Sequence, residues 1–196
     1  TCMTTYLDGK ILISPPKMRD WRFAKSLVYI WKHDVSGAGG VIVNKKVNTP
    51  SFDTVCLQGK IKKNPDVNPT IFYGGPVMTN LVGCLHSLDY KLATTNSDMN
   101  KIGFTLDKTI IEDIAVGKGP SKYILTVGFS SWGAGQLETE LESAPPRPKT
   151  GSWLILDYDI EILFGPKLNT QWQDALANCV AKTTKNLKDK VFKNKS

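Results

Sequence analysis

The most constraining feature of this sequence is a series of short apolar runs, rich in β-branched and aromatic residues, that glycine and proline separate. The clearest run is residues 27–31, Leu-Val-Tyr-Ile-Trp. A continuous apolar run of this length predicts a strand that is covered on both faces. Residues 10–14 read as an earlier strand, which Pro15-Pro16 ends because proline cannot donate to a sheet ladder. The sequence therefore predicts a sheet inside the fold.

The glycine-rich segment after the first long run predicts a hairpin. Residues 34–40 contain Ser36-Gly37-Ala38-Gly39-Gly40, which is typical of a turn because these residues accept positive φ angles. Residues 41–44 follow at hairpin distance and are expected to pair back on the run at 27–31. Further strands are expected at 70–73, 83–86, 102–105, 123–129 and 153–156.

Helices are expected between these strands. The clearest is 108–116, where Asp107 is a plausible N-cap, Gly117 follows the end, and the isoleucines give one apolar face. Others are expected at 52–57, 133–142, 159–164 and from Asn169-Thr170 onward. Strands and helices mix without strict alternation, so the pattern favours an α+β fold over a doubly wound sheet.

Length and charge indicate one domain with a basic tail. The chain has 196 residues, of which 41% are apolar and 22% charged, the usual mix for a packed domain. Residues 182–196 carry +5 of the net charge of +7, so we expect a single domain over 1–181 and a basic, flexible tail over 182–196. No segment reaches the roughly 20 apolar residues of a membrane span, and no secretory signal is visible, which predicts a cytoplasmic protein without membrane contact.

No enzyme motif is complete. Residues 128–132 read Gly-Phe-Ser-Ser-Trp and fail the nucleophile-elbow pattern at the last position. No phosphate loop is present, and the glycine pairs at 117–119 and 133–135 lack the third glycine of a dinucleotide fingerprint. The four cysteines and two histidines are scattered, so no metal site is expected. The sequence therefore predicts a protein that is not an enzyme and that uses no cofactor.

His86-Ser87 is the only pair that looks reactive. Neighbours in an extended segment point to opposite faces, so these side chains are poorly placed to act together as base and nucleophile. We expect an ordinary structural role for His86. A hydrolase or transferase built on His86, Ser87 and Glu138 is the weakest alternative.

Several segments between about Gly9 and Leu176 combine glycine turns and aromatic residues in a specific order and spacing. The most specific is Gly117-Lys118-Gly119-Pro120, followed by Tyr123, residues 128–129 and Trp132-Gly133-Ala134-Gly135-Gln136-Leu137-Glu138. The other segments are 9–13, Phe23, 26–30, 33–34, 37–44, 73–77, 85–87, 153–154, 161–164 and 172–176.

In order and spacing these segments resemble the AlgH/YqgE family. The resemblance implies an irregular, coiled and bifurcated β-sheet with a barrel-like core, flanked by helices. Members of the family have been labelled transcriptional regulators, but their biochemical function is unknown, and this sequence contains no helix-turn-helix signature. The chain departs from the family pattern at Asp20-Trp21, Gly39 and Lys45-Lys46, which weakens the expectation of a shared contact near Asn44. Its lysine- and asparagine-rich texture also suits a divergent viral copy of a bacterial family.

The preferred function is a non-catalytic binding or regulatory protein that docks to a protein partner or a small ligand. Glycine lets a backbone approach a partner closely, and a glycine turn that opens a helix presents free N–H groups. The candidate site residues are Asn44, Gly74, Gly75, Pro76, His86, Ser87, Trp132, Gly133, Gly135 and Gln136. The alternative is that the glycines serve only tight turns and that Trp132 belongs to the core.

The second functional hypothesis is nonspecific nucleic-acid contact through the tail. Its lysines would neutralise phosphates with little sequence preference. They are Lys182, Lys185, Lys188, Lys190, Lys193 and Lys195. The alternative is a solubilising tail, as charge runs usually are. The identity of a partner and the oligomeric state stay open.

Overall fold

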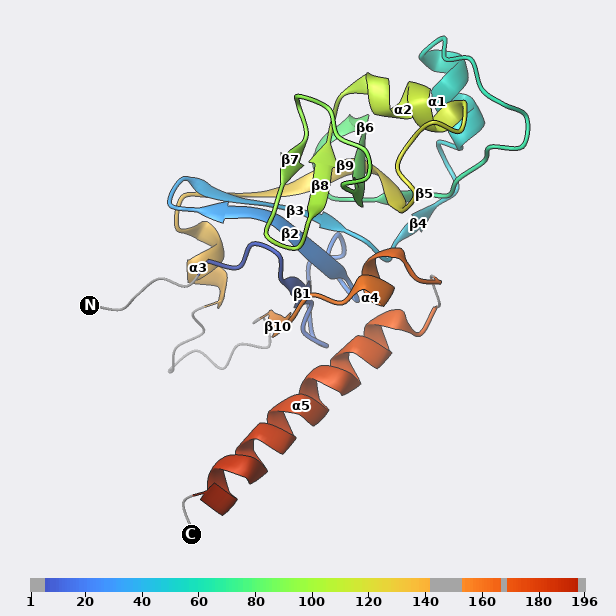
Figure 1. Cartoon of the computed structure of the whole chain (residues 1–196). Coiled ribbons are helices and arrows are strands. Elements are labelled where there is room, and N and C mark those ends of the chain that lie inside the picture. Colours follow the sequence, from blue (N-terminus) through green and yellow to red (C-terminus); the bar gives the residue numbers. More distant parts are fainter. Residues whose placement is uncertain (1–5, 142–152, 167–168, 194–196) are drawn as a thin grey trace.

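The apolar runs pair into an antiparallel ladder at the centre of the computed structural model, which describes residues 6–141, 153–166 and 169–193 (Figure 1). Strand β1 (Ile11–Ile13) lies between β10 (Leu154–Leu156) and β2 (Leu27–Asp34), and β2 pairs in turn with β3 (Gly37–Ile42). The expected strands at 10–14, 27–31 and 153–156 are therefore confirmed.

The second half of the sheet is built on the longest strands. Strand β9 (Tyr123–Gly133) pairs antiparallel with β6 (Val77–Ser87), and β8 and β7 continue the sheet beyond β6. The remaining strands are β4 (Lys46–Val47), β5 (Ile71–Tyr73), β7 (Asn96–Ser97) and β8 (Ile102–Thr105). In the described part of the chain the order is β10-β1-β2-β3-β9-β6-β8-β7, with β4 and β5 as a branch.

The sheet branches at β9. Residues 125–127 of β9 pair in parallel with β5, whereas residues 130–133 pair antiparallel with β3. Between these two stretches Gly128 has a positive φ of 72°, which turns the strand from one partner to the other. The branched sheet and its flanking helices confirm the expected α+β fold.

Five described helices cover the sheet. Helix α1 (Phe52–Gln58) begins at the Ser51 cap, and α2 (Lys108–Ala115) begins at Asp107, whose side chain accepts from the Thr109 amide as expected. The others are α3 (Gln136–Leu141), α4 (Ile160–Phe164) and α5 (Gln171–Lys193). The expected helix end near Pro145 lies outside the described residues.

The central strands are buried on both faces, as the continuous apolar run predicts. On β2, Leu27 and Tyr29 face a cluster that includes Trp172 of α5, while Val28 and Ile30 face a second cluster. The second cluster contains Leu137 of α3 together with two tryptophans, Trp132 and Trp153. A third cluster packs α1 and α2 on the other half of the sheet.

The predicted hairpin turn is wrong in its position. Asp34 pairs with Gly37, so the turn consists of Val35 and Ser36, and the glycines belong to β3. Their physical role is close packing, because a Cβ on Gly39 would lie 2.4 Å from the Trp31 ring. That ring stacks on Phe104 with centroids 4.9 Å apart.

Two further elements are longer than expected. Strand β6 begins at Val77 rather than near residue 83, because residues 78–81 are exposed and carry no continuous apolar signal. Helix α5 continues to Lys193, so the basic segment from Lys182 onward begins inside a helix. Figure 1 shows the second half of α5 extending away from the sheet.

We expect Gly39→Ala to lower the free energy of unfolding by about 1–3 kcal/mol, because the added methyl group displaces the stacked Trp31 ring. Gly133→Ala is the matched control, since its Cβ would meet only the Gln136 side chain at 3.8 Å. The control should stay within about 0.5 kcal/mol of the parent protein. Urea unfolding measures both, and equal midpoints for the two variants would contradict the packing argument.

Candidate functional site

A pocket of about 460 Å³ lies where the loop before β2, the start of β6, the end of β9 and helix α3 meet. Its volume is within the range of about 300–1,000 Å³ that is usual for small-molecule sites. The lining residues are Met18, Asp20, Arg22, Phe23, Pro76, Ser131, Trp132, Gln136, Glu140 and Trp153. They combine an aromatic wall with a charged rim.

Three aromatic rings form the wall. Phe23 lies 6.5 Å from the Trp132 ring and 5.7 Å from the Trp153 ring, centroid to centroid. Both tryptophans are buried in the cluster beneath α3. The Trp132 indole nitrogen donates to Glu140 Oε2 at 3.0 Å, so α3 holds the ring in one orientation. The core therefore fixes the two tryptophans, whereas Phe23 belongs to the loop before β2 and packs against them.

Asp20 and Arg22 form the charged rim. The Arg22 guanidinium donates to the Asp20 carboxylate at 3.0 Å from Nε and at 2.7 Å from Nη2. These hydrogen bonds hold the pKa of Asp20 below its usual value. The same guanidinium lies 5.8 Å from the Phe23 ring centroid. The pair places one fixed cation and one fixed anion beside the aromatic wall.

Gln136 closes the turn that opens α3. Its Oε1 accepts from the Gly133 amide at 2.9 Å, and Gly135 adopts a φ of 71° in between. The side chain therefore stabilises the turn while it lines the pocket. With six residues, α3 is too short for its N-terminus to serve as an anion site in its own right.

The structure brings three of the sequence-predicted site residues together: Pro76, Trp132 and Gln136. Gly74 and Gly75 lie instead at the crossing of β5 with β9. A Cβ on Gly74 would lie 2.3 Å from the Gly128 carbonyl oxygen, and one on Gly75 would lie 2.3 Å from that of Phe129. Close strand packing accounts for these two glycines.

Asn44 lies away from this pocket and has a structural task. Its Oδ1 accepts from the Leu27 amide at 2.9 Å, and its Nδ2 donates to the Lys25 carbonyl at 3.0 Å. These bonds tie the loop before β2 to the end of β3. Asn44 lines a second pocket, next to Lys45 and Lys46.

The three residues of the hydrolase alternative, His86, Ser87 and Glu138, contact three different side chains. His86 Nε2 lies 2.7 Å from Thr105 Oγ1, while the Ser87 hydroxyl donates to Asp89 at 2.6 Å. Glu138 instead contacts the ring of His33. The geometry therefore does not place His86, Ser87 and Glu138 in one reactive group.

His86 is a buried link between strands. Its Nδ1 lies 2.9 Å from the Ser87 carbonyl, to which it donates, so Nε2 accepts from the Thr105 hydroxyl. Burial lowers the pKa of the ring, with smaller opposing effects from the Ser87 carbonyl and Asp89. The ring is therefore held neutral inside the fold.

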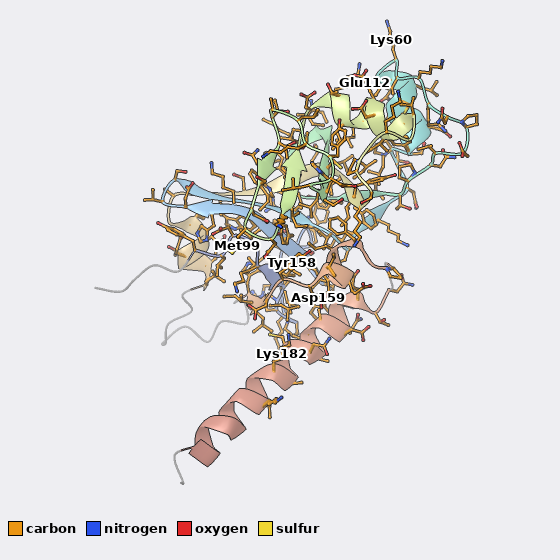
Figure 2. All side chains as sticks on the ribbon, in the orientation of Figure 1. Lys60, Met99, Glu112, Tyr158, Asp159 and Lys182 are labelled. Atoms are coloured by element: carbon orange, nitrogen blue, oxygen red, sulfur yellow. The ribbon has the colours of Figure 1, made fainter. Side chains whose placement is uncertain are left out.

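The lysines of the second hypothesis lie on or beyond α5. Lys182 and Lys185 are exposed on the helix, and Figure 2 shows Lys182 at its middle. Lys188, Lys190 and Lys193 fall in the helical backbone, whereas Lys195 lies outside the described residues.

Sequence reasoning missed the other pocket residues: Met18, Asp20, Arg22, Phe23, Ser131, Glu140 and Trp153. The available signal was the alternation of charged and aromatic residues in Asp-Trp-Arg-Phe at 20–23, outside the segments expected to be strands. In the described residues, no group of three or more His, Cys, Asp and Glu is placed to hold a metal ion. None of the described helices has the length and apolar character needed to cross a bilayer.

The fold and the pocket define a class: α+β proteins with a branched, largely antiparallel sheet flanked by helices. A model of the AlgH-like family (DUF179) matches residues 11–184, and the chain belongs to this family. The resemblance inferred from the motifs is therefore confirmed.

Relatives and solved structures agree with this assignment. A UPF0301 protein of Afipia carboxidovorans is 38% identical over 183 residues, covering 88% of this chain and 83% of the relative. A UPF0301 protein of Rhodopseudomonas palustris is 36% identical, covering 87% and 79%. The solution structure of the AlgH protein from Pseudomonas aeruginosa superposes with a TM-score of 0.70 at 29% identity, covering 90% of each chain. These relatives are bacterial and give no support to a viral source.

We expect the buried His86 to make stability depend on pH between 7 and 5. Its pKa is lowered in the folded state, so the unfolded chain binds more protons as pH falls through the ordinary value of 6.5. Folding is therefore weakened below that pH, by at most about 1.4 kcal/mol per pH unit from this group.

The test compares urea unfolding of the parent protein and His86→Gln at pH 7, 6 and 5. Glutamine keeps hydrogen-bonding groups but does not titrate, so the variant should lose less stability over this range. His33 is present in both proteins, so it does not contribute to the difference between their unfolding curves. Parallel curves would show that His86 does not carry the dependence.

Proposed function

We propose that the protein is a non-catalytic binding protein with a regulatory role, which receives part of a protein partner or a small ligand in the pocket beside Trp132. The supporting observation is that Pro76, Trp132 and Gln136, from segments far apart in the sequence, converge there with Arg22 and two further aromatic rings. The family assignment is consistent with this proposal but names no partner.

The pocket suits a flat or apolar group that carries a polar end. Phe23 is only partly buried and presents ring surface, bordered by the small exposed parts of the two tryptophans, against which an aromatic or aliphatic group of the partner would pack. The Asp20–Arg22 pair offers one acceptor and one donor group at the rim. A bound carboxylate would compete with Asp20 for the guanidinium, whereas a bound amine would compete with Arg22 for the carboxylate.

The separate hydrogen-bond networks of His86, Ser87 and Glu138 favour binding over catalysis. A serine nucleophile needs a base that can take its proton, but hydrogen bonds from Ser87 and Ser121 hold the pKa of the Asp89 carboxyl below its usual value, so the group that Ser87 contacts is a weak base. Turnover of any substrate that disappears in His86→Ala while the fold is retained would contradict this proposal.

Filling the pocket should abolish docking without unfolding the protein. Gln136 is an exposed pocket residue at the start of α3, so Gln136→Trp adds a ring system at the pocket without changing the sheet. Gln136→Glu is the matched control, because it has nearly the same size and keeps the side-chain oxygen that accepts from the Gly133 amide.

The measurement is cross-linked affinity capture from nuclease-treated lysate of the source cell, together with a thermal-shift screen of small carboxylates and amines. We expect one species to be retained by the parent protein and by Gln136→Glu, and lost with Gln136→Trp. Equal retention by all three proteins, with matching melting temperatures, would show that this pocket is not the docking site.

A second candidate function uses α5, because the helix carries exposed Lys182 and Lys185 away from the sheet. A chain that ends at Ala181 should then bind single-stranded DNA more weakly than the full chain. For the full chain, the logarithm of the affinity should fall with the logarithm of salt with a slope of about −0.7 per phosphate neutralised. Fluorescence anisotropy measures both, and equal affinity of the two chains would exclude the basic segment as the contact.

A further inference from the structure

A second pocket, of about 380 Å³, lies between the loop before β2, strand β4 and the amino end of α5. It is lined by Ala24, Lys25, Asn44, Lys45, Lys46, Asn169, Trp172 and Gln173. Three of these residues are lysines, and none of the described lining residues carries a carboxylate. The ion pairs found among the described residues do not involve these lysines.

Lys45 is half-buried without a carboxylate partner among the described residues. Its ammonium donates to the carbonyl of Arg22 at 2.9 Å and to that of Trp21 at 3.3 Å. Burial lowers its pKa, and the charge of Asp20 opposes this only in part, because Asp20 is paired with Arg22. A partly desolvated cation of this kind is stabilised by an anion that enters from the open side.

Lys25 and Lys46 flank Lys45 from two different elements. Lys25 adopts a positive φ of 52°, and the Asn44 side chain holds its carbonyl. Lys46 lies on β4, in register with Phe72 of β5. The positions from which both exposed side chains reach the pocket are therefore set by the fold.

The amino end of α5 forms the opposite wall. The Trp172 indole donates to the Ser14 carbonyl at 3.1 Å, which fixes the first turn of the helix against β1. Asn169 and Gln173 add amide groups that can donate to an anion. The positive end of the helix dipole adds to the charge of the lysines.

We propose that this pocket binds the phosphate groups of a small, multiply charged ligand, of the inorganic pyrophosphate or nucleoside polyphosphate class. Lysine ammonium groups bind phosphate as point charges and tolerate several orientations of it. The pocket has the volume of a small-molecule site and is bounded on three sides, which suits a compact anion better than an extended polymer. This site is separate from the aromatic pocket and does not depend on the function proposed for it.

The test is isothermal titration of the full chain with pyrophosphate at low salt, compared with Lys25→Gln/Lys46→Gln. Both lysines are exposed, and Lys45 is left in place because it anchors the loop. We expect the double variant to bind at least about tenfold more weakly, since it loses two charge-assisted contacts.

Lys60→Gln/Lys62→Gln is the matched control, because it removes the same charge from the loop after α1. Neither Lys60 nor Lys62 is among the residues that line the pocket. We expect less than about a threefold change in this control. Unchanged melting temperatures show that each variant is folded.

Three results would overturn the proposal. The first is the absence of pyrophosphate binding by the parent protein. The second is equal weakening in the pocket variant and the lysine control, which would reduce the effect to net charge. The third is tight binding of a 20-nucleotide single strand that weakens in the pocket variant while pyrophosphate neither binds nor competes. The surface would then belong to a nucleic-acid contact.

Discussion

The close contact between the Gly74-Gly75 turn and Gly128 is the constraint on which the rest of the structure depends. At this crossing β9 leaves β5 and joins β3, and the Gly74 carbonyl accepts from both the Ile42 amide and the Ser130 hydroxyl. Any side chain on these glycines would collide with backbone atoms. Because β9 changes partner here, its last residues are carried beside Pro76, and the aromatic pocket forms at that place.

One loop, residues 20–25, supplies a wall to both pockets. Asp20, Arg22 and Phe23 face the aromatic pocket, whereas Ala24 and Lys25 face the basic one. Lys45 holds the loop in place because its ammonium donates hydrogen bonds to two backbone carbonyls of the loop. The loop thus has no strand or helix of its own and owes its position to polar contacts with the end of β3. This explains why substitutions that test either pocket must spare Lys45.

Local signals in the sequence predicted most elements but only three of the residues that line the aromatic pocket. The apolar run at 27–31 predicts β2, and the Asp107 cap predicts the start of α2, because each signal depends only on residues close in the sequence. The hairpin turn was misplaced because the glycines serve the packing of Trp31, a contact across two strands. Pocket residues such as Arg22 and Trp153 meet only through such long-range pairing, which periodicity cannot reveal.

The distribution of charge also depends on long-range contacts that the sequence alone does not reveal. Most of the net charge lies in the last fifteen residues, so a tally along the sequence draws attention to the tail. The fold instead brings Lys25, Lys45 and Lys46 together where no described carboxylate lines the pocket. A lysine in water with a nearby acid contributes little to recognition, because solvent and salt screen it. A half-buried lysine without a counter-ion is screened less, so burial and pairing, rather than the number of charges, decide where an anion binds.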